Sequence, residues 1–295
     1  ARRQRQMCIR DRHIAFSGGL DSTVLLHLLA SLANTETLPP LSAIHVHHGL
    51  QAAADAWPSH CQGVCDELGV PLQVVLVQIQ SGASVERAAR EARYRAFTEV
   101  TGAGQVMLTG QHRDDQAETL LFRLLRGAGV RGLAAMPVHR PLGGGHLLRP
   151  LLDVSRVELQ AYAHQHQLQW IEDPSNADSR FSRNYLRNRV FPLLSERWPQ
   201  AVASLARTAE HLSEAQGLLD ELAVIDLQTA DQPSPFPWLA LPSLALAPLR
   251  EFSDARQRNA LRHWLTPLTR LPDSDHWAGW YSCLLYTSDA ADERS

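Results

Sequence analysis

The sequence contains no lysine, because all 28 of its basic residues are arginine, against 31 acidic residues. A chain without lysine has no Walker-type phosphate-binding lysine and no lysine amine for Schiff-base chemistry. The formal net charge of −3 provides no overall attraction for nucleic acid. Any contact with RNA would therefore have to come from local basic patches.

Cysteines and long apolar runs are also scarce. Four cysteines in 295 residues make no disulfide framework. Cys61 and Cys65 stand four residues apart in a helical pattern, where buried thiols are expected. No stretch approaches the roughly 18 consecutive apolar residues of a membrane helix, and the arginine-rich start lacks the apolar core of a secretion signal. We expect a cytoplasmic protein that makes no contact with a membrane.

The two ends of the chain differ from the sequence between them. Residues 1–12 carry many arginines without any periodicity, and residues 281–295 follow a tryptophan-rich segment without a helix stop. We expect residues 1–12 to be a non-native leader and residues 281–295 to be a non-native tail. An ordinary terminal tail is the alternative.

From residue 13 to about residue 110, short apolar runs alternate with helical patterns, as in parallel sheets built from βαβ units. Small and polar residues gather after the expected strands, where open parallel sheets bind their ligands. The fold class is therefore α/β, with an open, mainly parallel, Rossmann-like sheet and helices on both faces. The expected strands are 13–16, 42–47, 72–79 and 105–109, and the helices about 21–33, 53–68, 84–101 and 114–126.

The second half of the sequence is mostly helical in pattern. Residues 127–150 are rich in glycine and proline, which predicts loops. A boundary near residue 198 divides a sheet domain over 13–197 from a smaller, mostly helical and truncated domain over 198–280. The expected helices are 155–167, 184–196, 201–229 and 253–266.

The segment SGGLDS, residues 17–22, follows the first expected strand. Gly18 and Gly19 have no Cβ atoms, so backbone amides there can approach an anion at the start of the next helix. Ser17 and Ser22 can donate hydroxyl hydrogen bonds, and Asp21 can hold Mg²⁺ or orient phosphates. A tight strand-to-helix turn with a capping side chain is the competing interpretation. Two hydroxyls and a carboxylate within six residues favour a phosphate site.

Histidines and carboxylates follow two later strands. His45 and His47 alternate along a strand without a nearby carboxylate or thiolate, which favours a site-lining role over a transition-metal site. A second group of histidine and carboxylate side chains lies at a strand end and on the start of the next helix. Carboxylates there interact with the positive end of the helix dipole. An acidic helix cap is the competing interpretation of this group, which consists of His112, Asp114, Asp115 and Glu118.

Two arginine-rich segments are candidate anion-binding surfaces. Arg87, Arg90 and Arg93 recur every three residues along one side of an expected helix, where a solvated face is the competing interpretation. Residues 180–189 combine cations with two aromatic rings, which suits RNA phosphates and an unstacked base. The side chains of this second segment are Arg180, Phe181, Arg183, Tyr185, Arg187 and Arg189.

The SGGLDS segment resembles the loop of the PP-loop ATP pyrophosphatase superfamily, whose members split ATP between the α and β phosphates. Further segments resemble one family within it, tRNA(Ile)-lysidine synthase, in order across about 13–200 and more loosely to about 279. His47 and Gln111 depart from the family pattern, which more often has HVNHGL and an Ala-His pair. The segments are HVHHGL (45–50), ERAAREARY (86–94), LTGQHRDDQAETLLFRLLRGAG (108–129), RPLLDVSR (149–156) and WIEDPSNADSRFSRNYLRN (170–188).

The resemblance implies a ligase that joins free L-lysine to C2 of the wobble cytidine of the AUA-decoding tRNA(Ile), which has a CAU anticodon. The reaction passes through an adenylated cytidine, requires ATP and Mg²⁺, and yields lysidine, AMP and pyrophosphate. A tRNA thiolase of the same superfamily and a non-catalytic tRNA-binding relative are the alternatives. The resemblance makes 13–197 the ATP pyrophosphatase domain and 198–280 the tRNA-binding domain, and it leaves a homodimer open.

The resemblance also assigns roles to residues. The proton acceptor would be His112 or a nearby carboxylate, and Asp21 would hold the metal. ATP would be bound by Ser17, Gly18, Gly19, Leu20, Asp21 and Ser22. The catalytic residues would be Asp21, Arg93, His112, Asp115 and Arg187, and lysine or tRNA would be bound by Arg90, Asp114, Glu118, Arg183 and Arg189.

Overall fold

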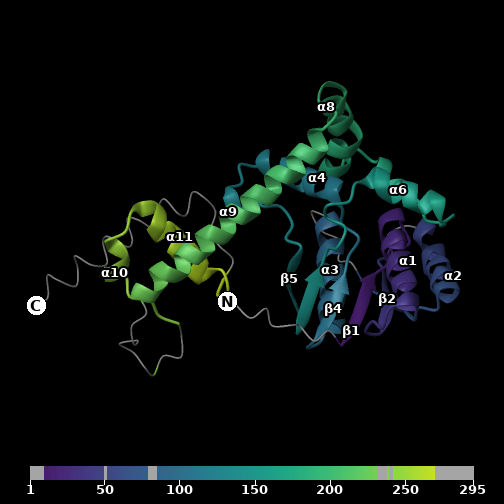
Figure 1. Ribbon diagram of the computed structural model, residues 1–295, viewed down its shortest axis with the longest axis horizontal. Coiled ribbons are helices and arrows are strands. Elements are labelled where there is room, and N and C mark those ends of the chain that lie inside the picture. The colour runs from purple at the N-terminus through teal and green to yellow at the C-terminus, as the bar shows by residue number, and fades with distance from the viewer. Residues whose placement is uncertain (1–9, 50–51, 79–84, 231–237, 239–241, 270–295) are drawn as a thin grey trace, which may run out of the picture. The chain divides into compact units, whose positions relative to one another are not determined.

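The computed structural model describes residues 10–49, 52–78, 85–230, 238 and 242–269 (Figure 1). The chain divides into two compact units, 1–213 and 214–295. All the candidate site residues belong to the first unit. Residues 1–9 of the expected leader and the whole expected tail lie outside the described residues, so their origin stays a prediction, as do the domain assignments.

A six-stranded sheet forms the centre of the first unit (Figure 1). Its order is β3-β2-β1-β4-β6-β5, and every neighbouring pair is parallel except the last, in which β5 runs antiparallel to β6. This confirms the expected open, mainly parallel sheet. The strands are β1 Asp11–Ala15, β2 Leu41–His47, β3 Leu72–Leu76, β4 Gln105–Leu108, β5 His139–Leu142 and β6 Gly145–Leu148.

Helices cover both faces of this sheet, as the sequence predicts. Along β4, Val106 and Leu108 pack into the core that contains α1, whereas Met107 between them packs into the core that contains Phe97 of α3. The helices are α1 Leu20–Thr35, α2 Trp57–Leu68, α3 Val85–Val100, α4 Arg113–Leu124, α5 Val130–Leu133, α6 Arg156–Gln165, α7 Ser182–Tyr185, α8 Phe191–Arg197 and α9 Ala201–Thr229.

Three short non-α turns lie next to these helices. The 3₁₀ turns η1 Ala52–Ala56 and η2 Pro174–Ala177 precede α2 and α7. A π-helical turn, η3 Leu186–Val190, separates α7 from α8, so the helix expected at 184–196 is interrupted. π-turns within helices frequently occur at functional sites.

The first strand is polar in sequence but is stabilised by hydrogen bonds to its neighbours. The buried Arg12 side chain donates from Nη2 to the Pro39 carbonyl at 2.6 Å, and His13 Nδ1 lies 2.7 Å from Ser42 Oγ. Ile14 is fully buried in the core. Arg12, which the sequence analysis placed in the leader, therefore pairs within the sheet.

The expectation of loops over 127–150 is wrong for the second half of that segment. β5 and β6 form a hairpin there, and β6 pairs with β4. Gly143 has a φ of +55° at the turn. At Gly145 a Cβ atom would lie 2.3 Å from the Gln105 carbonyl oxygen, so only glycine allows the close approach to β4. Four-residue strands rich in Pro, Gly and His are stabilised by sheet pairing rather than by propensity.

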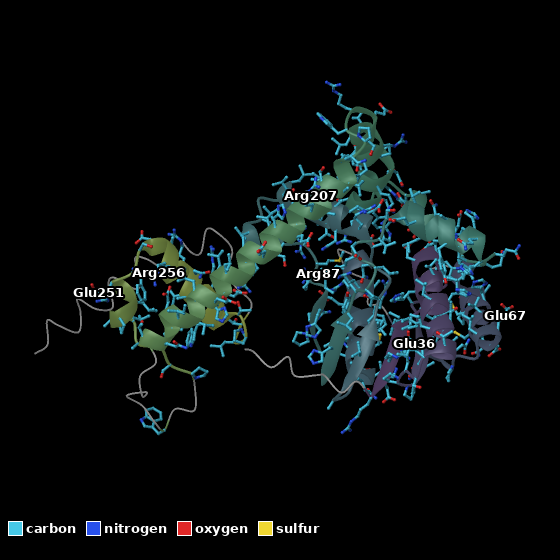
Figure 2. All side chains as sticks on the ribbon, in the orientation of Figure 1. Glu36, Glu67, Arg87, Arg207, Glu251 and Arg256 are labelled. Atoms are coloured by element: carbon cyan, nitrogen blue, oxygen red, sulfur yellow. The ribbon has the colours of Figure 1, made fainter. Side chains whose placement is uncertain are left out.

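The second unit consists of the end of α9, α10 Ala247–Arg250 and α11 Asp254–Leu265. Its core contains Leu249 and Leu261, which are 3% and 5% exposed. The buried Asp226 carboxylate pairs with Arg256, which Figure 2 labels. None of the helices in the described part of the chain combines the length and apolar character needed to cross a membrane.

Candidate active site

The SGGLDS loop connects β1 to α1 and presents its backbone at the start of that helix. Gly18 has a φ of +81°, and a Cβ atom there would lie 2.9 Å from Ile171 Cδ1 and 3.0 Å from Cys61 Sγ. The Ser17 amide donates to Ser22 Oγ at 3.2 Å, and the two serine hydroxyls are 3.0 Å apart. A preformed loop of amides and hydroxyls at a helix N-terminus suits a phosphate.

Gly110, which the sequence analysis did not single out, fixes the other side of this loop. A Cβ atom at Gly110 would lie 2.9 Å from the Asp21 carbonyl oxygen and 3.1 Å from the Ser22 amide nitrogen. The end of β4 can therefore pack against the loop only because residue 110 is glycine. The signal in the sequence was a glycine directly after an apolar strand.

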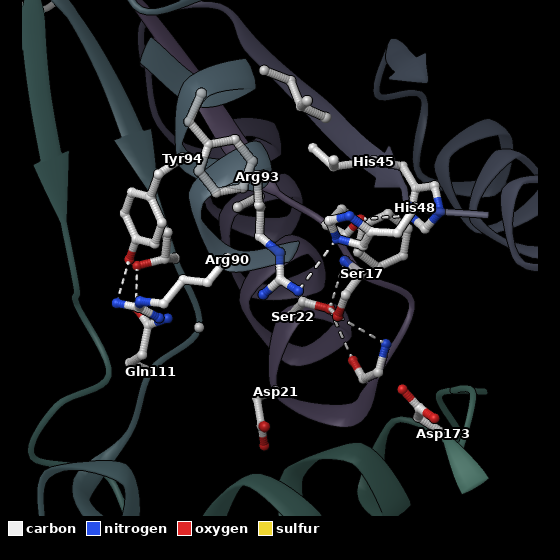
Figure 3. A pocket seen from close by; sticks show the side chains of 18 of the residues that line it. Ser17, Asp21, Ser22, His45, His48, Arg90, Arg93, Tyr94, Gln111 and Asp173 are labelled. Atoms are coloured by element: carbon white, nitrogen blue, oxygen red, sulfur yellow. Dashed lines mark hydrogen bonds between the residues drawn. The ribbon is translucent and has the colours of Figure 1, made fainter. Parts of the chain in front are cut away.

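The loop opens on a pocket of about 300 Å³, shown in Figure 3. Gln111 lines the pocket from the end of an expected strand, and Tyr94 and Asp173, which were not predicted as site residues, line it as well. Asp173 caps η2 by accepting from the Ser175 amide at 2.8 Å, which a D-P-S sequence could have indicated. The predicted residues that line this pocket are Ser17, Gly19, Asp21, Ser22, His45, Arg90, Arg93 and Asp115.

A second groove of about 920 Å³ shares part of this lining. Ser17, Asp21 and Arg93 belong to both. Leu20, Arg187 and Arg189 line the groove alone. The structure therefore places the loop, Arg93 of α3 and part of the basic segment at two cavities that share lining residues.

The α3 arginines have different environments. Arg93 lines both cavities, and burial, reinforced by the charge of Arg90, lowers its pKa. The Arg90 guanidinium lies over the Tyr94 ring, 4.7 Å from its centroid. Arg87 pairs with Glu91 at 2.8 Å on the exposed side of the helix (Figure 2). The solvated-face interpretation therefore applies to Arg87, whereas Arg90 and Arg93 face the pocket.

His112 is the centre of the acidic group. Its side chain is 1% exposed, and its Nε2 lies 3.6 Å from Asp21 Oδ2 and 3.5 Å from Asp115 Oδ2. Its Nδ1 lies 3.6 Å from Asp114 Oδ2. Burial alone would lower the pKa of His112, but the surrounding carboxylates outweigh burial and raise it to about 10. At neutral pH the imidazole is therefore a cation held among three carboxylates.

Part of the acidic group also caps helices, as the competing interpretation proposed. The His112 amide donates to Asp115 Oδ2 at 3.1 Å at the start of α4. Asp114 Oδ2 accepts from the Arg156 amide at 2.9 Å at the start of α6. Asp115 reaches the pocket as well, so it combines a capping role with a position in the site.

Arg187 binds two of the predicted acidic residues. Its Nε and Nη2 donate to the two carboxylate oxygens of Glu118 at 2.6 and 2.9 Å, and Nη2 also contacts Asp115 Oδ1 at 3.2 Å. Glu118 is 3% exposed, and burial raises its pKa although Arg187 opposes the rise. Arg187 stands in the π-helical turn η3. No local sequence pattern indicated this ion pair, because Arg187 and Glu118 are 69 residues apart.

The other arginines of the basic segment have separate environments. Arg180 is held by Asp178 at 2.7 Å. Arg183 is half-buried, and Arg189 is exposed beside the groove. The rings of the same segment stay accessible, since Phe181 is 37% and Tyr185 is 52% exposed. Arg189 and the two rings thus remain available to a large polyanion.

Asp21 provides the feature on which a magnesium site can be tested. Its Oδ1 is buried and has no hydrogen-bond partner among the residues that the structure describes. Mg²⁺ is commonly bound through one or two carboxylates together with substrate phosphates. Within the described ranges, no three His, Cys, Asp or Glu side chains are arranged to hold a metal ion by themselves. Asp21 therefore fits a metal that arrives with phosphates.

Comparison with known proteins identifies the first unit. Residues 4–194, more than half of the chain, match the family model described as a PP-loop domain. The chain belongs to the PP-loop family. Residues 244–293 match a second model, described as the TilS substrate binding domain. The SGGLDS loop, residues 17–22, lies within the matched range and is named the PP-loop from here on.

Curated relatives of this PP-loop chain are named tRNA(Ile)-lysidine synthase. The protein of Pseudomonas fluorescens is 73% identical over 267 residues, which cover 90% of this chain and 60% of the relative. The protein of Pseudomonas aeruginosa is 69% identical over 272 residues, which cover 91% and 62%. The chain thus spans about three fifths of the length of these relatives.

A solved structure shares the PP-loop fold at low identity. The U34-tRNA thiolase NcsA from Methanococcus maripaludis superposes with a TM-score of 0.57 at 18% identity, covering 69% of this chain and 72% of the thiolase. In this chain Cys61 and Cys65 are buried, and burial raises their pKa values to about 12 and 11. These two thiols therefore remain protonated and unreactive.

Proposed function

We propose that this chain carries the catalytic part of a tRNA(Ile)-lysidine synthase, which acts in the cytoplasm on the AUA-decoding tRNA(Ile) and free L-lysine. The observation that carries the proposal is the convergence of the PP-loop and the acidic group. Asp21 and Asp115 line one pocket, and His112 Nε2 lies within 3.6 Å of both carboxylates. The names of the relatives at 73% and 69% identity support the same reaction.

The first step is adenylation of the wobble cytidine. The PP-loop amides and the hydroxyls of Ser17 and Ser22 bind the phosphates of ATP, and Arg93 places a cation beside them. The cytidine O2 attacks the α-phosphate, the bond to the β-phosphate breaks, and pyrophosphate leaves. Asp21 would hold the Mg²⁺ that, when bound, neutralises charge on the phosphates. Positioning and charge stabilisation account for most of such catalysis.

His112 is unsuited to act as the base, because a group with a pKa of about 10 is protonated at neutral pH. We assign it instead as a buried cation that holds Asp21 and Asp115 in place. An imidazolium between two carboxylates keeps the metal-binding side chain and the lysine-facing side chain at fixed positions. The candidates for the proton acceptor are then the carboxylates of Asp115 and Glu118.

The second step is attack by the ε-amine of lysine on C2 of the adenylated cytidine. The carbon–nitrogen bond forms, the C2–O bond to the phosphate breaks, and AMP leaves. The lysine ammonium first transfers a proton to Asp115 or Glu118. Arg187 is bound to both carboxylates and favours their ionised forms. It also lines the groove that admits the RNA.

The basic segment is the RNA-contacting surface proposed for the first unit, and the second unit is a separate candidate for tRNA recognition. Arg183 and Arg189 bind phosphates of the anticodon loop, and Phe181 and Tyr185 are exposed rings on which an unstacked base can lie. The match of residues 244–293 to a substrate binding domain supports a role in tRNA recognition for the second unit. The formation of a homodimer stays a prediction.

The deciding experiment measures pyrophosphate release from ATP by the purified full chain. We expect release that requires tRNA(Ile) with a CAU anticodon, and we expect L-lysine to be required for repeated turnover and for lysidine in the product RNA. Release that depends on a sulfur donor and not on lysine would favour a thiolase, and tRNA binding without release would favour a non-catalytic relative. The Asp21→Ala variant should abolish release while tRNA affinity, measured by filter binding, stays nearly unchanged.

A further inference from the structure

Two histidines of the pocket keep a nitrogen without a hydrogen-bond partner. His45, at the end of β2, is 2% exposed, and its Nε2 is buried without a partner among the described residues. Nδ1 of His48, just beyond β2, has the same status. Both residues line the 300 Å³ pocket beside Ser17. A buried polar atom without a partner carries a free-energy cost that a ligand can offset.

The tautomer of His45 follows from its neighbour. Nδ1 of His45 lies 3.0 Å from the carbonyl oxygen of Phe16, which can only accept a hydrogen bond. Nδ1 must therefore carry the proton, and Nε2 of the neutral ring has a free lone pair. Burial, the largest influence, lowers the pKa of His45 and keeps the ring neutral. His45, which lines the pocket, thus has an acceptor nitrogen without a partner among the described residues.

His48 has the opposite arrangement. Its Nε2 lies 3.4 Å from Nη2 of Arg93, which can only donate, as the dashed line in Figure 3 marks. Nε2 must therefore be unprotonated, and Nδ1 carries the proton. Burial and the charge of Arg93 lower the pKa of His48 to about 4, so this ring is neutral as well. His48 thus presents a donor to the pocket.

We infer that His45 and His48 position the ribose of ATP, with His45 Nε2 accepting a hydrogen bond from a ribose hydroxyl and His48 Nδ1 donating one. A hydroxyl both donates and accepts, so it matches this pair. The inference rests on the proposed use of ATP and assigns His45 as a specificity-determining residue of that site. Phosphate oxygens provide no donor at neutral pH, so they cannot satisfy His45.

The position of His45 favours the ribose over the base. Its ring is fixed to the carbonyl of Phe16, the residue immediately before the PP-loop, and Phe16 itself pairs with Ile44. The His45 ring is therefore held beside the loop that binds the phosphates. In a nucleotide the ribose is the group next to the phosphates, and the base lies beyond it. The adenine amino group is the other donor of ATP, and the experiment below separates the two.

Two substitutions separate the two nitrogens of His45. In His45→Asn, the side-chain amide can still donate to Phe16 but has no atom near the former Nε2. In His45→Gln, the longer side chain can place its carbonyl oxygen near that position. His13→Asn is the matched control, because His13 on β1 also has a bonded Nδ1 and a buried, unpartnered Nε2 but does not line the pocket.

The test measures dissociation constants of the full chain by calorimetry for ATP, 2′-deoxy-ATP, 3′-deoxy-ATP and inosine triphosphate, without tRNA. The wild type should bind one deoxy analogue about tenfold more weakly than ATP. It should bind inosine triphosphate with the same affinity as ATP. His45→Asn should weaken ATP about tenfold and lose this discrimination. His45→Gln should retain part of it, and His13→Asn should retain all of it.

Other outcomes would overturn the inference. An equal loss for all four nucleotides in His45→Asn would make His45 only structural. If the wild type binds inosine triphosphate more weakly than ATP and His45→Asn removes this difference, His45 contacts the base and not the ribose. These results are distinguishable from a failure of the proposed function, in which the wild type releases no pyrophosphate with lysine and tRNA. A wild type that does not bind ATP at all would overturn both.

Discussion

Replacing Arg187 with alanine would leave the Glu118 carboxylate buried without its partner. The wild-type side chains are joined by two hydrogen bonds of 2.6 and 2.9 Å, and Glu118 is 3% exposed. Burial already raises the pKa of Glu118, and loss of the guanidinium should raise it further. The variant should therefore be less stable, and it should recover part of that stability at low pH, where Glu118 becomes neutral.

The size of the loss follows from the burial of the two partners. Removing one member of a buried ion pair costs about 3–5 kcal/mol. The Arg187 side chain is 31% exposed, so water partly screens the pair, and we expect about 2–3 kcal/mol. Arg189 is exposed, and its replacement by alanine should change stability by less than about 0.5 kcal/mol.

Hydrogen exchange of the α4 amides, followed by mass spectrometry, measures this loss in the first unit without assuming that the whole chain unfolds at once. The double variant Arg187→Met with Glu118→Gln should regain most of the protection because no buried charge remains. It should not regain adenylation. Arg187→Ala should lower both tRNA affinity and single-turnover adenylation, whereas Arg189→Ala should lower affinity and its salt dependence alone. Identical behaviour of the two alanine variants would refute this reasoning.

Three further predictions concern the loop and the acidic group. Asp115→Asn should raise the KM for lysine more than it slows adenylation, and an unchanged lysine dependence would contradict the assignment. The folded-state pKa of His112, about 10, exceeds its ordinary value of 6.5, so its contribution to stability is complete below about pH 6.5 and disappears as pH rises through 10. Urea unfolding between pH 6 and 10.5 should therefore show a steeper decline for the wild type than for His112→Gln. Gly110→Ala should weaken ATP binding at least about tenfold in calorimetry, whereas Gly63→Ala, which meets no atom within 4 Å, should not.

Much of the sheet was predictable because β1, β2 and β4 contain buried apolar residues and the helices between the strands have helical periodicity. Alternation of apolar runs with helical patterns located β1 to β4 to within a few residues. The hairpin of β5 and β6 escaped prediction because its residues have low strand propensity. Its stability depends on pairing with β4, and that long-range contact leaves no local pattern in the sequence.

The candidate site was predictable where function depends on a local motif. Glycines and hydroxyls within six residues indicated the phosphate loop, and a strand end followed by carboxylates indicated the acidic group. The charge of His112 was predictable only in part, because Asp114 and Asp115 are close to it in sequence but Asp21, which also raises its pKa, is 91 positions away and on another helix. The ion pair of Arg187 with Glu118 escaped for the same reason.

The contact of Gly18 with Ile171 and Cys61 restricts how this sequence can change over time. Three positions on three separate segments share one small volume, with a hypothetical Cβ atom at 2.9 and 3.0 Å from the other two side chains. A larger side chain at either partner would push the loop as effectively as a mutation in the loop itself. The size of Cys61 is thus constrained, and because its Sγ also lies 3.4 Å from His45 Nδ1, serine could replace it in a lineage where leucine could not.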